Sequence, residues 1–150
     1  MPELPDALYA QIRALCEQGD ELEEEDQFAE SIACFQKAWQ LLPEPRWSWD
    51  AGLWILGALG DVYFLNEDFA EAATALREAM QHYPEAPDNP FLCLRLGQCL
   101  AELGELEEAR QWLTSALETE GEEIFEGEDP RYLDLARDGT FPEFDETESD

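Results

Sequence analysis

The side chains that most often carry out catalysis are few or poorly placed in this 150-residue chain. Its one histidine, His82, comes at the end of a predicted helix, where stabilisation of the helix C-terminus accounts for it without chemistry. Carboxylates are so numerous that no pair stands out as a general acid and base. The four serines all lack the sequence context of a nucleophile elbow: Ser31, Ser48, Ser115 and Ser149. We therefore expect no catalytic residues.

Metal and cofactor chemistry is equally poorly supported. The chain has four cysteines: Cys16, Cys34, Cys93 and Cys99. They form no CxxC pair and have no histidine at the spacing of metal ligands, and each lies in a helical apolar pattern. We expect reduced thiols of an intracellular protein. The acidic runs GDELEEED and EGEEIFEGED lack the order of a calcium loop, and no glycine-rich phosphate loop occurs. The sequence thus predicts neither a metal nor a cofactor, and a cation-dependent hydrolase is the least favoured class.

Charge is the unusual property of the chain. Thirty-seven Asp and Glu face eight Lys and Arg, which gives a formal net charge of -29 at pH 7. Such a charge repels nucleic acids and anionic lipids, and it attracts a basic protein; the alternative is that it serves only solubility. The N-terminus has no pattern of a signal peptide, and no apolar run approaches the ~18 residues of a membrane span. We expect a cytoplasmic protein that binds neither nucleic acid nor membranes.

Three segments of the chain repeat one pattern. A glycine is followed nine residues later by a bulky apolar residue, and then by a small, a bulky and a second small residue at fixed steps. The successive positions are Gly19, Phe28, Ser31, Phe35 and Ala38; Gly60, Phe69, Ala72, Leu76 and Ala79; and Gly97, Leu106, Ala109, Leu113 and Ala116. The pattern predicts three pairs of antiparallel helices, over residues 12–45, 53–86 and 90–121. Residues 122–139 then form a C-terminal cap within a single domain, 1–139, and residues 140–150 form an acidic tail.

This repeat resembles the tetratricopeptide repeat, whose unit is a helix, a turn and a second helix. The resemblance covers about residues 12–121 and implies an all-α protein, a right-handed α-solenoid of three helical hairpins with a capping helix. In this family the first helices of successive repeats line a concave groove. Members that bind chaperone C-terminal carboxylates place lysines, arginine and asparagines there. Acidic residues and a cysteine occupy the equivalent places here, with Arg13 as the main exception. Binding of a chaperone's C-terminal carboxylate is therefore disfavoured.

Tryptophans gather in the segment PRWSWDAGLW, residues 45–54. In an extended connection Trp47 and Trp49 would point to different sides, and the segment either seals the joint between the first two repeats or borders a partner surface. Trp54 and Phe91 likewise either pack between repeats or anchor a partner. The candidate binding residues are Arg13, Asp20, Glu23, Trp47, Trp49, Trp54, Asp61, Phe64, Phe91, Gln98 and Glu102.

A more specific resemblance rests on WILGALGDVYF, NPFLCLRLGQCL and GEEIFEGEDPRYLDL. These stretches look like small bacterial tetratricopeptide proteins, some of which are associated with polymorphic or Rhs-type toxin loci as immunity proteins. The resemblance implies a non-catalytic protein that neutralises a basic toxin. A chaperone of a secretion or assembly system is the alternative, and the oligomeric state stays open.

Overall fold

The computed structural model describes residues 4–142, which contain no β-strand, so the predicted all-α architecture is confirmed. Short 3-10 helices (η) lie in three of the connections. The elements in chain order are α1 (Asp6–Glu24), α2 (Phe28–Leu41), η1 (Arg46–Ser48), α3 (Asp50–Leu65), α4 (Phe69–His82), η2 (Ala86–Asp88), α5 (Pro90–Glu102), α6 (Leu106–Glu120), η3 (Glu122–Phe125) and α7 (Pro130–Asp138).

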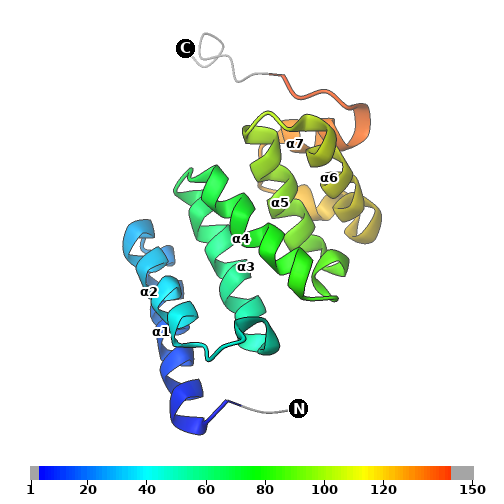
Figure 1. Ribbon diagram of the computed structural model, residues 1–150. Coiled ribbons are helices and arrows are strands. Elements are labelled where there is room, and N and C mark those ends of the chain that lie inside the picture. Colours follow the sequence, from blue (N-terminus) through cyan, green and yellow to red (C-terminus); the bar gives the residue numbers. More distant parts are fainter. Residues whose placement is uncertain (1–3, 143–150) are drawn as a thin grey trace. The chain divides into compact units, whose positions relative to one another are not determined.

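Two compact units make up the chain, residues 1–88 and residues 89–150. The first unit contains α1 to α4 (Figure 1). Helix α1 packs against α2 and α3 packs against α4, while α2 also contacts α3, so the two hairpins join into one body. All four helices contribute side chains to its core, among them Ile12, Phe35, Ile55 and Leu76.

The second unit contains the α5–α6 hairpin and the C-terminal helix α7, which packs against α6. Its core includes Leu96, Leu113 and Leu135. Phe125 of η3 is buried as well, in agreement with the predicted cap. The organisation of residues 1–139 as a single domain stays a prediction.

In each hairpin a glycine of the first helix packs against a bulky side chain of the second helix. A Cβ added to Gly60 would lie 2.6 Å from Cγ of Leu76, well inside van der Waals contact. The glycine therefore lets α3 and α4 approach closely, and the leucine fills the space that a side chain would need. The same relation holds between Gly19 and Phe35 and between Gly97 and Leu113. The small residues of the pattern are fully buried in all three hairpins: Ser31, Ala38, Ala72, Ala79, Ala109 and Ala116.

The same turn joins the two helices of every hairpin. The amide N–H of Asp68 donates to the carbonyl oxygen of Tyr63 over 2.8 Å, and equivalent bonds close the other two turns. The residue before this amide has a positive φ each time, at Asp26, Glu67 and Gly104. Positive φ favours glycine, and only the third turn has a glycine at this position. The other two turns therefore each carry a backbone cost of roughly 1 kcal/mol.

The connection between the first two hairpins differs from the prediction. It is not extended, because Arg46–Ser48 form a 3-10 helix in which the N–H of Ser48 donates to the Pro45 carbonyl over 3.1 Å. Helix α3 begins at Asp50, and no side chain caps its N-terminus. Helix α5 is capped by Asn89, whose Oδ1 accepts the N–H of Phe91 at 2.9 Å.

The last described residues fold back on α7. Phe141 stacks on the Tyr132 ring with centroids 5.7 Å apart, and Gly139 ends the helix in the left-handed region. Residues 140–142 of the predicted acidic tail thus belong to the packed part of the second unit. Residues 143–150 lie outside the described residues.

Candidate protein-binding surface

Two helices of the first unit carry both exposed aromatic rings and acidic groups. Tyr9 on α1 and Trp54 on α3 are 37% and 53% exposed, and their rings meet edge to face with centroids 6.3 Å apart. Positions four and seven residues apart share one face of a helix, so Arg13 and Asp20 follow Tyr9 on α1, and Asp61 and Leu65 follow Trp54 on α3. We call these six residues the α1–α3 surface.

The acidic end of this surface is electrostatically crowded. Partial burial raises the pKa of Asp20 above its usual value, and Glu24, Glu17 and Asp61 raise it further. Because Asp61 belongs to α3, its effect shows that the two predicted site residues lie near each other across the helix pair. A positive group brought between them would relieve this repulsion. Asp20 and Asp61 thus lie near each other across the helix pair, and Trp54 lies on the same face of α3 as Asp61.

Cys16 lies on the same face of α1 and is half-buried. Burial, with the charge of Asp20 and the neighbouring Cys34, raises the pKa of its thiol to about 11. The thiol is therefore protonated at neutral pH, a state that is neither a nucleophile nor a metal ligand. All four cysteines are free thiols in the structure.

Three further predicted site residues lie on α1 and α3, and of these only Arg13 belongs to the α1–α3 surface. Arg13 pairs with Glu17 of its own helix through a 3.2 Å contact that is exposed to solvent. Phe64 is half-buried and its ring packs edge to face on Phe69, with centroids 5.6 Å apart. Glu23 is half-buried. Phe64 therefore contributes to the closure of its own hairpin.

Trp47 and Trp49 take part in a packed joint between the two hairpins. The Trp47 ring stacks on His82 at 3.8 Å and also contacts Trp39, while the Trp49 indole N–H donates to the Pro43 carbonyl over 2.9 Å. The buried Tyr83 hydroxyl donates to the Trp49 carbonyl over 2.8 Å, and burial raises the pKa of this phenol to about 12. His82 is thus a ring-stacking partner of Trp47. These contacts favour the structural alternative for the two tryptophans.

In the second unit the C-terminal segment covers two predicted site residues. Gln98 is fully buried; its amide donates to Glu128 over 3.0 Å, and its oxygen accepts from Arg95 over 2.9 Å. The placement of Gln98 on an accessible surface was therefore wrong. Phe91, at the start of α5, is 66% exposed.

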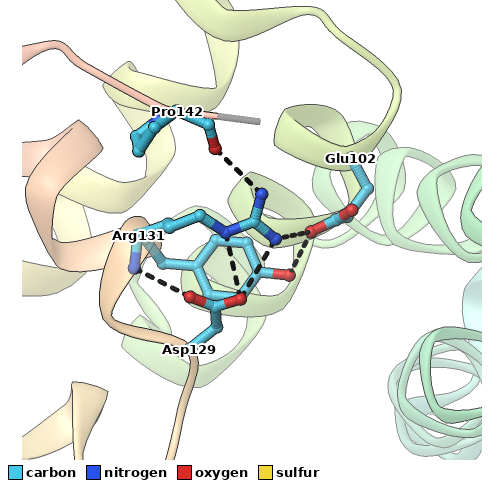
Figure 2. A network of polar contacts seen from close by, with 5 residues as sticks. Glu102, Asp129, Arg131 and Pro142 are labelled. Carbon is cyan, nitrogen blue, oxygen red and sulfur yellow. Dashed lines mark hydrogen bonds and ion pairs between the residues drawn. The ribbon is translucent and has the colours of Figure 1, made fainter. Parts of the chain in front are cut away.

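Glu102 belongs to a polar network that ties α5 to α7, drawn in Figure 2. It accepts hydrogen bonds from the Tyr132 hydroxyl at 2.7 Å and from Arg131 at 3.4 Å. Arg131 also pairs with Asp129 and donates to the Pro142 carbonyl at 3.0 Å. Glu102 is thus already engaged within its own unit. The sequence predicted a C-terminal cap over residues 122–139, but not that this cap would engage Glu102.

The described part of the chain has neither a metal-binding cluster nor a membrane-spanning helix. Residues 4–142 contain no group of three or more histidine, cysteine or acidic side chains arranged to hold a metal. Nor does any helix within them have the length and apolar character that crossing a membrane requires. The surface residue that sequence reasoning missed is Tyr9, because α1 begins at Asp6, ahead of the repeat. Extending the helical spacing back from Arg13 by one turn would have found it.

Comparison with known proteins identifies the repeat. Two family models, both described as tetratricopeptide repeat, match residues 63–137, half of the chain, and residues 12–43. The structure is similar to the N-terminal domain of stress-induced protein-1 (STI-1) from C. elegans, with a TM-score of 0.63 at 18% identity, over 89% of this chain and 97% of that one.

It is also similar to the Sgt2 TPR domain from Aspergillus fumigatus, with a TM-score of 0.61 at 16% identity, over 89% of this chain and 87% of that one. At these identities the likeness concerns the fold. No curated protein matches the sequence.

Proposed function

The chain belongs to the tetratricopeptide repeat family, and on that premise we propose that it is a non-catalytic protein that binds its partner through the α1–α3 surface. Repeats of this family serve as protein-interaction modules and are generally non-catalytic. One observation carries the proposal: an exposed pair of aromatic rings, Tyr9 and Trp54, lies on the same two helices as the crowded carboxylates Asp20 and Asp61. Exposed aromatics are the usual energetic anchors of interfaces, and the carboxylates select basic groups.

The partner that fits this surface is a basic protein, and we infer that it is a bacterial toxin that this chain neutralises in the cytoplasm. The net charge of -29 supports this inference, because it would steer a cationic partner to the surface and accelerate association. A rigid helical surface needs little ordering on binding, which favours tight inhibition. The choice of a toxin among basic proteins rests on the resemblance to tetratricopeptide proteins of toxin loci.

A chaperone of a secretion or assembly system is the second candidate. The observation in its favour is the exposure of large apolar side chains in both units, Trp54, Leu65, Phe91 and Leu103 among them. An apolar client would bind with little dependence on salt. A basic toxin would associate markedly more slowly as salt is raised, with its dissociation rate little changed.

The test uses Trp54→Ala and a matched control, Leu103→Ala, which removes an exposed apolar side chain in the other unit. The chain is co-expressed with the toxic product of the neighbouring gene, growth rescue is scored, and the Kd is measured with the purified pair. Loss of a central aromatic costs about 2 kcal/mol of binding, roughly a thirtyfold rise in Kd. Trp54→Ala should therefore abolish rescue while Leu103→Ala preserves it.

Both variants should keep the melting temperature of the wild type, because both side chains are largely exposed. Equal affinity of the two variants would show that the α1–α3 surface is not the binding site. A fall in melting temperature that matches the loss of binding would assign Trp54 to the core instead.

A further inference from the structure

A recess lies on the opposite side of α3 from Trp54. Helical spacing puts Trp54 and Asp61 on one face of α3, and Leu56, Leu59 and Tyr63 on the other. These last three residues, with side chains of α2 and α4, line a pocket of about 350 Å³. All of its walls belong to the first unit, whose helices α2, α3 and α4 appear in Figure 1. We call it the α2–α4 pocket.

The lining of the pocket combines a flat apolar wall with carboxylates. Trp39, Leu56, Leu59 and Ala75 provide apolar contact, and Glu71 and Glu78 of α4 bring negative charge. None of the ten lining side chains is basic. A hydrogen bond of 2.7 Å from the Gln36 amide to the Tyr63 hydroxyl links α2 to α3 within this lining. The pocket is therefore a preformed recess whose lining offers both apolar contact and negative charge.

From this geometry we propose that the α2–α4 pocket binds an arginine side chain presented by a protein partner. An aliphatic stem would lie along Leu56, Leu59 and Ala75. The guanidinium group would lie beside the Trp39 indole and between the two carboxylates, where it gains both ring and charge contacts. Arginine suits such a site better than lysine, because its planar group is less strongly hydrated and stacks on aromatic rings.

The size of the pocket agrees with this occupant. About 350 Å³ is at the lower end of the roughly 300–1,000 Å³ that ligand sites span, which suits one long side chain and its adjoining backbone. The net charge of -29 would favour the approach of a partner that carries arginine. The site goes beyond the proposed function, because it lies on another face and does not depend on the α1–α3 surface.

The test measures binding of the blocked tripeptide Gly-Arg-Gly by shifts of backbone amide and indole NMR signals. The full chain is compared with the variant Glu71→Gln/Glu78→Gln. A matched control, Glu118→Gln/Glu120→Gln, removes the same charge from exposed positions of α6. We expect shifts at the Trp39 indole and at α4 amides such as those of Thr74 and Ala75. The pocket variant should bind about tenfold more weakly than the control.

Peptides with lysine or citrulline in place of arginine separate specific recognition from diffuse attraction. Citrulline keeps the shape of arginine without its charge and should produce no shifts, and lysine should bind more weakly than arginine. The proposal is overturned if millimolar arginine peptide leaves the α4 signals unmoved, or if both double variants lose affinity equally. It is also overturned if the shifts appear only on α1 and the Trp54 face of α3, or if lysine binds as well as arginine. Each of these results leaves the toxin-binding test unaffected.

Discussion

Asp20 lies among carboxylates that oppose its own ionisation. Its pKa is raised in the folded protein, first by partial burial and then by Glu24, Glu17 and Asp61. A carboxyl whose folded pKa exceeds the unfolded value is favoured in its neutral form, so folding is penalised while it is charged. That penalty is present at neutral pH and disappears as the pH falls through the folded pKa. A residue that weakens its own fold is consistent with selection for binding.

Replacing Asp20 by asparagine should therefore stabilise the protein at pH 7. The expected gain is below about 1 kcal/mol, because the side chain is exposed and solvent screens the repulsion. The gain should shrink as the pH falls below the raised pKa, where the wild-type carboxyl is already neutral. Thermal unfolding of both proteins across this pH range measures the effect. A lower melting temperature for Asp20→Asn at pH 7 would mean that the carboxylate is stabilising.

Gly60 gives a second residue-level prediction, with two opposing effects. Alanine is favoured over glycine in a helix interior by about 1 kcal/mol, so helix propensity alone predicts that Gly60→Ala stabilises. The added Cβ, however, would lie 2.6 Å from Cγ of buried Leu76. Overpacking of this kind costs about 1–3 kcal/mol, so we expect net destabilisation. Urea unfolding decides between the two, and if the clash is the cause, Gly60→Ala should cost less in a Leu76→Ala background than in the wild type.

At the level of elements, the sequence could predict what depends on local repetition. The glycine and small-residue pattern was sufficient for the three hairpins, because the contacts of each hairpin lie within one repeat and recur in each copy. It could not predict the burial of Gln98 or the engagement of Glu102, because the segment that covers them comes from outside the repeat. The 3-10 helix at Arg46–Ser48 was missed for a similar reason. Its stabilising contacts come from the distant end of α4, where His82 stacks on Trp47 and the Tyr83 hydroxyl donates to the Arg46 carbonyl.

The C-terminal cap depends on Arg131, which connects α7 to α5 and to the end of the described chain. Its guanidinium group pairs with Glu102 and Asp129 and lies 4.4 Å from the centre of the Phe141 ring. The side chains of Arg131 and Glu102 are only 18% and 22% exposed, so losing the arginine would leave a poorly solvated carboxylate.

Arg131→Met should accordingly destabilise the second unit by about 2 kcal/mol. Arg13→Met is the matched control, because its ion pair with Glu17 is largely exposed and should contribute less than about 0.5 kcal/mol. Hydrogen exchange of peptides that cover α7 locates the effect. Unchanged protection of α7 in Arg131→Met would show that apolar packing alone holds the cap.

For the whole molecule, the excess of acidic groups acts on stability as well as on partner choice. Few of the 37 acidic side chains can pair with the eight basic ones, so the folded chain holds like charges closer together than the unfolded chain does. Apolar burial in both units opposes this repulsion. Partner binding and folding therefore respond to salt in opposite directions, since screening weakens attraction to a basic partner and relieves repulsion within the chain.

Raising sodium chloride from 0.01 M to 1 M, which shortens the screening length from about 30 Å to about 3 Å, should raise the melting temperature. A gain of about 1 kcal/mol corresponds to roughly 2–4 °C for a chain of this size. Near the isoelectric point of about 4.1 the net repulsion is small, so the same titration there should change the melting temperature much less. An equal rise at both pH values would assign the effect to salting-out of apolar surface. A fall at pH 7 would mean that the ion pairs of the C-terminal cap outweigh the repulsion between the remaining acids.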